Sequence, residues 1–340
     1  MRSASRSALA TLILMGPLAP GASAQRTAAT VDRPVNTYSI VARDSVTGEL
    51  GVAVQSHWFS VGSLVPWAEA GVGAVATQSF VDPSYGPLGL ELMRAGKTAT
   101  QALAALLAAD PNTAVRQVAM VDAHGDVAAH TGSQAIEGAG HLAGAGYTVQ
   151  ANLMLSDTVP ETMARAFERA RGDLADRLMA ALAAAEATGG DLRGRQSAAL
   201  LVVRGRPSGQ PWNDRIFDLR VEDHADPLGE LRRLLDLARA YRHMNAGDEA
   251  LARGDTEAAL REYSSAERLA PDEATNGELV FWRAVTLASS DRVEESLPLF
   301  RRAYAQDSNW ADLLPRLAQA GHFPDDPTLV RRIIAAMVAR

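Results

Sequence analysis

The sequence predicts an α+β fold, in which antiparallel sheets are covered by helical layers and followed by an all-helical domain. From residue 37 to residue 221, strand-like and helical segments occur in alternating blocks, and the helices come in pairs. Paired helices disfavour a doubly wound parallel sheet, in which single helices connect the strands. A four-layer αββα sandwich fits this order of elements. After about residue 227 only helical patterns remain, and part of the pattern repeats at an offset of 36 to 37 residues.

Residues 1–24 have the pattern of a secretory signal peptide. Arg2 opens a basic start, Ala8–Leu18 is an apolar stretch, and Ala22-Ser23-Ala24 fits the small-x-small cleavage pattern. Because the apolar stretch is too short to span a bilayer comfortably, cleavage and export are favoured over a membrane anchor. We therefore expect a mature chain without a membrane span, located in the periplasm or outside the cell. It would begin at Gln25 and carry residues 25–36 as a polar leader or linker.

The first block of the sandwich combines a β-hairpin, a further strand and a pair of helices. Two β-rich segments flank a Thr47-Gly48 turn signal, which is typical of a hairpin. Gly96 and the Asp110-Pro111 pair are helix terminators, and they end the two helical patterns that follow. The expected strands are Thr37–Arg43, Leu50–Gln55 and Gly73–Gln78, and the expected helices are Pro87–Ala95 and Thr98–Ala109.

The second block repeats this alternation. A His124-Gly125 turn separates two strand patterns, and Gly189-Gly190 ends a pair of helical patterns. Strands are therefore expected before and after each pair of helices. The expected strands are Arg116–Asp122, Val127–Thr131, Tyr147–Leu155, Gln196–Val203 and Ile216–Val221, and the expected helices are Pro160–Arg171 and Asp173–Thr188.

The C-terminal region contains an internal repeat. Ala259-Leu260, with Tyr263 and Ala266, reappears as Ser296-Leu297, with Phe300 and Ala303, and the turns Gly254-Asp255 and Ser290-Asp291 match as well. Helix–turn–helix pairs at about 34 residues are the tetratricopeptide signature. We therefore predict a tetratricopeptide-like array over residues 237–340, with a last helical pair over Trp310–Ala339; the alternative is a generic helical bundle. Such arrays bind a protein partner or pack on a neighbouring domain, and the repeat by itself indicates no chemistry.

Composition and missing motifs exclude several functional classes. The net charge of -7 disfavours a nucleic-acid binder. The chain has no cysteine, which excludes disulfides, thiolate metal sites and cysteine nucleophiles. Lys97 is the only lysine, so a P-loop or SxxK mechanism elsewhere is excluded. GxSxG, HExxH and histidine pairs at metal-ligand spacing are also absent from the sequence, so we expect neither a metal nor an organic cofactor.

Thr37 offers a nucleophile that needs neither lysine nor cysteine. It opens the first predicted strand, and cleavage of the Asn36–Thr37 bond would make it an N-terminal residue. An N-terminal α-amino group has a pKa near ~8 and can take the hydroxyl proton directly or through water. The alternative is that Thr37 is only a β-branched strand residue, which the pattern alone favours.

Six segments, in order along the chain, carry a resemblance to a known family. They are TYSIVARDSVTGELGVAVQS (37–56), VPWAEAGVGAVATQSFVDPSYGPLGLELMRAG (65–96), QVAMVDAHGDVAAHTG (117–132), GYTVQANLML (146–155), GGDLRGRQSAALLVV (189–203) and DLRVEDHADPLGELRRLL (218–235). They resemble the bacterial family called domain of unknown function 1028, over about residues 36–236. That family is grouped with the N-terminal-nucleophile (Ntn) hydrolases, whose fold is the αββα sandwich, and its members commonly begin at a Thr or Ser that opens the first strand.

The resemblance implies a division of the chain and a reaction. Residues 37–236 would form the Ntn-hydrolase-like domain, and residues 237–340 would be an added helical domain. Thr37 would hydrolyse an amide bond in a small amide or peptide substrate. The reaction is inherited from the superfamily fold, because the family itself has no settled substrate. Sandwich domains of this class often assemble, so the chain could form a homo-oligomer.

Further residues are expected near Thr37 from motifs that follow the core strands. A backbone N–H after the third strand would stabilise an oxyanion, an effect typically worth about 3–4 kcal/mol. The Asn152 amide would bind the nucleophile's amine or the oxyanion, or be a satisfied core amide. Arg195 would clamp a substrate carboxylate or pair with Asp191. The catalytic candidates are Thr37, Gln78, Ser79 and Asn152, and the substrate-binding candidates are Gln55, Ser56, His57, Asp191, Arg193, Arg195 and Ser197.

Two features depart from the proteasome-type pattern. No lysine is available to match the catalytic lysine, and residues 25–36 would still precede Thr37 after signal removal. Activity therefore requires a second cleavage, by Thr37 itself or by another protease. Without it, the alternative is a non-catalytic binding or scaffold protein that recruits an envelope partner through its helical repeats. A third reading, binding of cell-wall peptide, rests only on the expected location.

Overall fold

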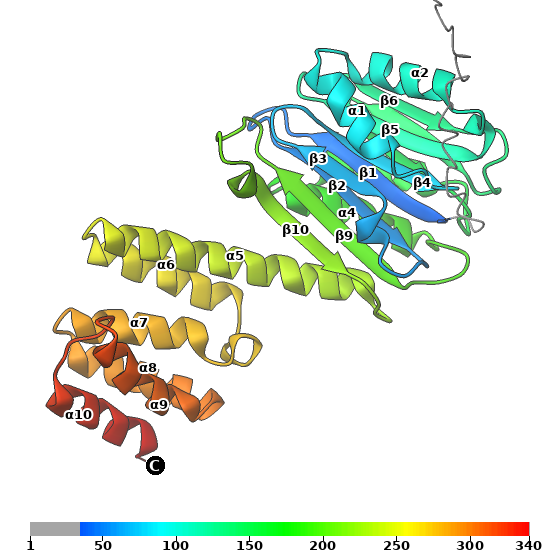
Figure 1. Ribbon diagram of the computed structural model, residues 1–340. Coiled ribbons are helices and arrows are strands. Elements are labelled where there is room, and N and C mark those ends of the chain that lie inside the picture. The colour runs from blue at the N-terminus through cyan, green and yellow to red at the C-terminus, as the bar shows by residue number, and fades with distance from the viewer. Residues whose placement is uncertain (1–34, 340) are drawn as a thin grey trace, which may run out of the picture. The chain divides into compact units, whose positions relative to one another are not determined.

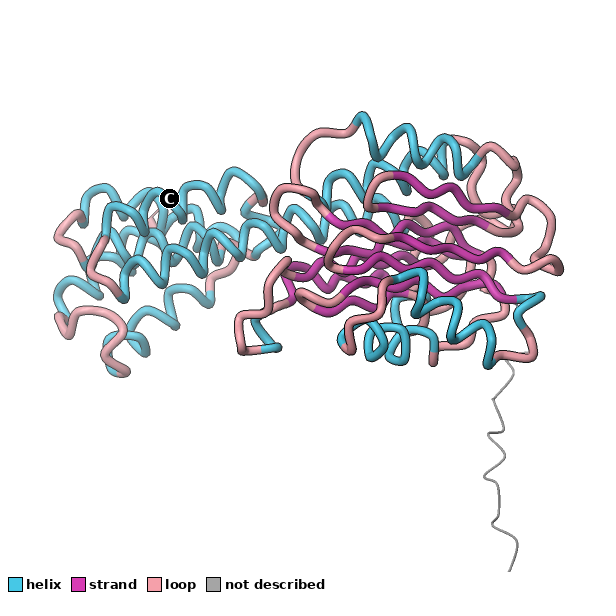
Figure 2. Tube along the Cα trace, turned by 90° about the horizontal axis from the view of Figure 1, so that it is seen from above, coloured by secondary structure: helices cyan, strands magenta, loops and turns pink. Residues whose placement is uncertain are grey.

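The computed structural model describes residues 35–339 of the 340-residue chain (Figures 1 and 2). The predicted signal peptide and the leader up to residue 34 lie outside these described residues. The predicted α+β class is confirmed: two antiparallel sheets occupy the N-terminal part of the described chain, and helices make up its C-terminal region. Within residues 35–339, no helix has the length and apolar character that crossing a membrane requires.

The larger sheet has six antiparallel strands in the order β10-β9-β2-β1-β8-β7 (Figure 1). The predicted hairpin is confirmed, because β1 pairs with β2 from Thr37 opposite Ser56 to Arg43 opposite Leu50. Gly48 in the turn has a φ of 76°, a conformation that glycine adopts without strain. The strands are β1 (Thr37–Arg43), β2 (Leu50–Ser56), β7 (Gly140–Gly144), β8 (Tyr147–Ala151), β9 (Ser197–Val203) and β10 (Arg215–Val221).

The smaller sheet has four antiparallel strands in the order β3-β4-β5-β6. They are β3 (Pro66–Glu69), β4 (Gly73–Ser79), β5 (Arg116–Asp122) and β6 (Val127–Thr131). The sequence patterns do not predict β3 or β7, and both are short edge strands. β3 begins at Pro66, which cannot donate to a ladder, and β7 begins and ends with glycine.

The two sheets pack face to face, with helices on their outer faces (Figure 2). Between the sheets, Val41 and Val52 of the larger sheet share one buried cluster with Ala76 and Ala119 of the smaller sheet. Helices α1 (Tyr85–Arg94) and α2 (Ala99–Ala109) cover the smaller sheet, and α3 (Val159–Arg169) and α4 (Leu174–Ala187) cover the larger one. Apolar side chains therefore fill three layers, one between the two sheets and one under each pair of helices.

Polar side chains mark where several helices begin. Thr98 and Gln101 form a capping box at α2, in which each side chain accepts a hydrogen bond from the other's backbone N–H. Asp173 accepts from the backbone N–H of Asp176 at the start of α4, and Asp226 caps α5 in the same way. These caps explain why the sequence-predicted helix starts at residues 98 and 173 lie within one residue of the observed ones.

The C-terminal helical region begins with one long helix, α5 (Pro227–Ala252). Its first half packs on the larger sheet through Leu231 and Leu235, and its second half packs on α6. The helix runs unbroken across the predicted boundary at residues 236 and 237. The following helices are α6 (Thr256–Leu269), α7 (Glu278–Ser289), α8 (Val293–Gln306), α9 (Asn309–Gln319) and α10 (Pro327–Val338). The 3-10 helices are η1 (Val61–Ser63), η2 (Thr113–Val115), η3 (Pro211–Asn213) and η4 (Asp272–Thr275).

Candidate active site

One end of the sandwich interior is polar and the other end is apolar. Side chains two residues apart on a strand share a face, so Thr37, Ser39 and Val41 of β1 all face the smaller sheet. Val41 lies among apolar neighbours, whereas Ser39 donates to Gln78 Oε1 across the sheets at 2.6 Å. Thr37, Ser39 and Gln78 are all fully buried. Burying polar groups without partners is costly, and Thr37, Ser39 and Gln78 all have hydrogen-bond partners at this end of the sandwich, which is the candidate site.

Thr37 is held at the first position of β1. Its Oγ1 donates to the carbonyl of Val35 at 2.8 Å and lies 3.1 Å from Ser56 Oγ. Its own carbonyl accepts from the backbone N–H of Asn152 at 3.1 Å and from Gln78 Nε2 at 3.2 Å. The Thr37 backbone is thus fixed by both sheets, while its hydroxyl faces the preceding residues of the chain.

The last two leader residues cover Thr37. Val35 and Ser79 exchange backbone hydrogen bonds, of 2.6 Å from Val35 N and 3.0 Å from Ser79 N. Ser79 adopts a φ of 68°, in the left-handed region that few residues other than glycine visit. Val35 is fully buried and Asn36 is 2% exposed. In the uncleaved chain, the space beside Thr37 is therefore filled by its own leader.

The carbonyl oxygen of Asn36 accepts two side-chain hydrogen bonds. Ser56 Oγ donates one at 2.5 Å, and Arg193 Nη2 donates the other at 2.8 Å. This carbonyl belongs to the peptide bond that precedes Thr37. A hydroxyl and a permanent positive charge thus polarise the carbonyl that Thr37 Oγ1 would attack.

Asp191 holds Arg193 in this position. Its carboxylate accepts from Arg193 Nη2 at 2.7 Å and from Arg193 Nε at 3.1 Å, which is a bidentate pair. The Asp191 side chain is fully buried and also accepts from the backbone N–H of His57 at 3.1 Å. The pair is therefore fixed by the residue after β2 and by the loop before β9. Of these candidates, Arg193 contacts Asn36, Asp191 holds Arg193, and His57 contributes its backbone N–H.

A chain of amide side chains supports the site from the smaller sheet. Gln78 Nε2 donates to Gln117 Oε1 at 2.7 Å, and Asn152 Nδ2 donates to the same oxygen at 2.8 Å. Gln117 Nε2 donates in turn to the carbonyl of Ala151 at 2.8 Å. Sequence reasoning missed Ser39 and Gln117. Their signal was a polar residue at an inward position of a strand that also carries apolar residues on that face, Val41 on β1 and Ala119 on β5.

Three predicted residues lie away from Thr37 or have structural roles. Gln55 pairs with Tyr38 and so faces the layer of α3 and α4, where its buried amide has no hydrogen-bond partner within residues 35–339. Arg195 pairs with Glu186 at 3.3 Å, not with Asp191, which Arg193 holds instead. Ser197 Oγ accepts from the backbone N–H of Val61 at 3.1 Å and holds the loop after β2. The structure brings together Thr37, Ser56, Gln78, Ser79, Asn152, Asp191 and Arg193.

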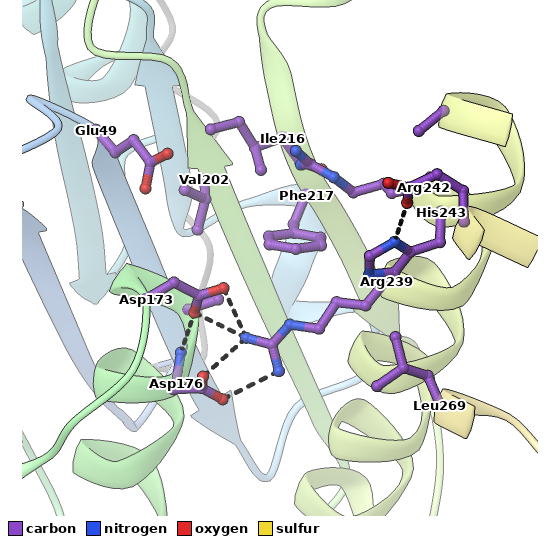
Figure 3. A pocket seen from close by; sticks show the side chains of 13 residues that line it. Glu49, Asp173, Asp176, Val202, Ile216, Phe217, Arg239, Arg242, His243 and Leu269 are labelled. Carbon is purple, nitrogen blue, oxygen red and sulfur yellow. Dashed lines mark hydrogen bonds and ion pairs between the residues drawn. The ribbon is translucent and has the colours of Figure 1, made fainter. Parts of the chain in front are cut away.

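A cavity of about 610 Å³ lies elsewhere, beside α5 (Figure 3). Its walls come from the β1–β2 hairpin, the start of α4, β9, β10, α5 and α6, and none of the predicted site residues lines it. Arg239 of α5 forms ion pairs there with Asp173 at 2.7 Å and Asp176 at 3.0 Å (Figure 3). Glu49 also lines it, at the end of the hairpin opposite to Thr37. The cavity is therefore separate from the polar end of the sandwich.

His, Cys, Asp and Glu are the side chains that most often hold metal ions in proteins. Among residues 35–339, no group of three or more His, Cys, Asp or Glu side chains is close enough to hold a metal ion.

The comparisons with known proteins give a family and a structural relative. Residues 37–231 match the family of unknown function DUF1028. The crystal structure of protein SPO2555 from Silicibacter pomeroyi, which is described under the same family, is 31% identical. It superposes with a TM-score of 0.54, over 60% of this chain and 89% of that chain. A search of curated proteins found no match.

Proposed function

The chain belongs to the DUF1028 family, whose function is unknown, and we propose that it is an exported Ntn-type amidohydrolase. Its nucleophile would be Thr37, freed by cleavage of the Asn36–Thr37 bond. The substrate would be an amide or peptide, and the C-terminal helices would be a tetratricopeptide-like array that positions a partner or covers the site.

One observation carries this proposal: the Asn36 carbonyl, held by Ser56 and Arg193, lies in the peptide bond that precedes a buried threonine hydroxyl. Attack of Thr37 Oγ1 on the carbonyl carbon would place negative charge on the carbonyl oxygen, where the two donors already point. Donors aimed at a developing oxyanion are typically the largest single contribution to such catalysis.

The cleavage step balances without a cofactor. The Thr37 hydroxyl adds to the Asn36 carbonyl carbon, the carbon–nitrogen bond breaks, and the hydroxyl proton passes to the Thr37 nitrogen. Water then hydrolyses the ester that has formed, which leaves a carboxylate on Asn36 and restores the Thr37 hydroxyl. The freed amine, with a reference pKa near ~8, could then act as the base for external substrates at neutral pH.

The arrangement of the layers supports the superfamily part of the proposal. β1 lies inside the larger sheet, its first residue is Thr37, and helices cover the outer faces of both sheets. Arg193 also supplies a fixed positive charge in a site where the sequence has no lysine. That charge would substitute for the missing lysine in stabilising anionic intermediates.

The repeat positions support a tetratricopeptide-like C-terminal region. Tyr263 and Ala266 of α6, and Phe300 and Ala303 of α8, are all buried at the matching positions. Gly247 of α5 allows close packing, since a Cβ there would meet the Tyr263 ring at 2.3 Å. Small and aromatic residues thus alternate where helices meet, as the repeat requires.

A second candidate function is a non-catalytic binding or scaffold protein. A cavity of about 420 Å³ on the C-terminal helices is lined by Tyr263, Trp282 and His322, among others. Aromatic side chains that line such a cavity are suited to binding a peptide partner. This reading predicts that residues 25–36 stay attached and that Thr37→Ala leaves the protein's function unchanged.

Activity measurements distinguish the amidohydrolase from the non-catalytic binding protein. The purified wild-type chain, Thr37→Ala and Thr37→Ser would be assayed on a panel of peptide and small-molecule amides. We expect hydrolysis by the wild type, reduced hydrolysis by Thr37→Ser, which keeps a hydroxyl, and none by Thr37→Ala. Equal activity of Thr37→Ala and wild type would exclude Thr37 as the nucleophile.

A further inference from the structure

The leader occupies the candidate site as a peptide would. Val35 and Ser79 exchange two backbone hydrogen bonds, from Val35 N to Ser79 O at 2.6 Å and from Ser79 N to Val35 O at 3.0 Å. This antiparallel bridge forms at the last residue of β4, and its two hydrogen bonds join backbone groups alone. Recognition by strand addition works in this way: the main chain gives affinity, and pockets for side chains give selectivity.

The side chain of Val35 enters an apolar pocket. It is fully buried in one cluster with Val61, Val65 and Val81. A residue at this position is therefore selected for apolar character and moderate size, because a charged side chain there would be desolvated without a partner.

The next residue, Asn36, supplies the carbonyl that Ser56 and Arg193 hold. Its side chain is also buried, and its Oδ1 has no hydrogen-bond partner among the described residues. The space around it therefore admits a small polar side chain without fixing it. Residues 35 and 36 together fill two adjacent subsites on the acyl side of the bond that Thr37 would attack.

From these contacts we propose that the substrate is a peptide, whose acyl side binds in extended form where Val35 and Asn36 lie. This inference rests on the proposed function, because the subsites open only when the Asn36–Thr37 bond is cut. The residue before the cleaved bond is small and polar and is held by Arg193 and Ser56. The residue before that is apolar and pairs with the Ser79 backbone.

The reaction on such a peptide balances with water as the only co-reactant. The Thr37 amine takes the hydroxyl proton as Oγ1 adds to the acyl carbonyl carbon, and it passes that proton to the leaving peptide amine as the carbon–nitrogen bond breaks. Water then hydrolyses the ester, which yields the peptide carboxylate and the free Thr37 hydroxyl. Arg193 and Ser56 hold the carbonyl oxygen in both steps.

The test uses the processed wild-type chain, with its N-terminus verified by mass. Four fluorogenic aminocoumarin amides would be compared: acetyl-Val-Asn, acetyl-(N-methyl)Val-Asn, acetyl-Asp-Asn and acetyl-Asn. The N-methyl group removes the N–H that would donate to Ser79 O, and the aspartate would enter the apolar pocket. We expect kcat/KM for acetyl-Val-Asn to exceed each of the others by roughly tenfold or more, the size of effect that one lost hydrogen bond or side-chain pocket produces.

The same subsites can be examined within the full-length chain. Val35→Asp should slow processing at Asn36–Thr37, and the matched variant Val35→Ile should process at nearly the wild-type rate. Processing of all three chains at one rate, together with equal kcat/KM for the four amides, would overturn the peptide inference and leave the proposed function standing. Absence of both processing and amide hydrolysis in the wild type would instead remove the proposed function, and this inference with it.

Discussion

Arg193 is the charged one of the two side chains that donate to the carbonyl before Thr37. It is bound on one side by the buried Asp191 carboxylate and donates on the other side to Asn36 O at 2.8 Å. The neighbouring Arg195 points to Glu186 instead and lies half exposed. Two arginines separated by one residue thus have different roles, which only their contacts distinguish.

We therefore predict that Arg193→Gln slows processing at Asn36–Thr37 by about 10²-fold or more, because loss of one oxyanion donor typically has that effect. Arg195→Gln is the matched control and should process at close to the wild-type rate. The measurement is the fraction of processed chain over time, by intact mass. Equal rates for Arg193→Gln and Arg195→Gln would show that Arg193 does not act on the carbonyl.

Glu49 lines the cavity beside α5, and its carboxyl shows how burial and nearby negative charge there affect stability. Burial, together with the negative charges of Asp173 and Asp44, raises the pKa of Glu49. A carboxyl with a raised pKa in the folded state costs stability once it ionises, so its cost is absent below its unfolded pKa of about 4.3 and grows as pH rises through the folded value.

Glu49→Gln should consequently raise the thermal unfolding midpoint at pH 7 by about 1–2 °C, because solvent screens this partly exposed carboxyl and keeps its cost below about 1 kcal/mol, which corresponds to ~2–4 °C. The gain should vanish near pH 4. Glu295→Gln is the control, because the hydrogen bond from Arg292 lowers the pKa of Glu295 and its neutralisation brings no gain. An unfolding midpoint unchanged by Glu49→Gln at pH 7 would show that the ionised Glu49 carboxylate does not destabilise the folded protein.

At the scale of the elements, helix α1 packs unusually close to the smaller sheet at Gly86. A Cβ on Gly86 would meet ring atoms of Trp67 at 2.3 Å, and that ring is anchored by its Nε1 donating to Leu64 O at 2.9 Å. At Gly89, one turn later in the same helix, the nearest atom is the flexible end of Met120 at 2.8 Å.

Gly86→Ala should therefore lower the free energy of unfolding by about 1–3 kcal/mol through overpacking, although Ala normally stabilises a helix over Gly by about 0.5–1 kcal/mol. Gly89→Ala should be close to neutral, because the Met120 side chain can move aside. Thermal unfolding of the two variants checks this. A Gly86→Ala protein as stable as Gly89→Ala would mean that Trp67 is not fixed.

Elements with strong local signals could be predicted from the sequence, and weak ones could not. The β1–β2 hairpin, β5 and β6 follow from alternation and turn residues, and their predicted bounds match the observed ones closely. β3 and β7 have no such pattern, because β3 has only four residues and begins with proline, and β7 begins and ends with glycine. Their existence depends on pairing with β4 and β8.

The residues of the candidate site also differ in whether the local sequence could predict them. Thr37, Ser56, Gln78 and Ser79 lie at strand ends, where motifs can be recognised. The roles of Arg193 and Gln117 depend on contacts between residues far apart in the sequence, such as Arg193 with Asn36. No local pattern distinguishes Arg193 from Arg195, so their different partners became known only from the fold.

At the scale of the whole chain, α5 joins the sheets to the C-terminal helices. Arg239 of α5 binds Asp173 and Asp176 at the start of α4, with distances of 2.7 and 3.0 Å. Burial raises the pKa of Asp176, but its hydrogen bonds with Arg239 and Arg232 outweigh this, so that its pKa is lowered overall. Stability from this contact is present above the unfolded pKa of about 3.9 and is lost as pH falls through the folded value.

Arg239→Gln should lower the free energy of unfolding by about 1–2 kcal/mol at neutral pH, because it leaves two carboxylates with weaker partners. The difference from wild type should shrink below pH 4. Arg233, on the same helix, is half exposed and forms an ion pair with Glu230 one turn away, so Arg233→Gln should cost less than about 0.5 kcal/mol. Equal losses for the two variants, or a loss that does not depend on pH, would contradict this role of Arg239.

The free-threonine mechanism requires that Thr37 become the first residue of the chain. Intact mass and N-terminal sequencing of the purified wild type, beside Thr37→Ala, test this most directly. We predict that the wild type begins at Thr37 and that Thr37→Ala begins at Gln25, with residues 25–36 retained. Both chains beginning at Gln25 would contradict the free-threonine mechanism and leave the binding protein as the better description.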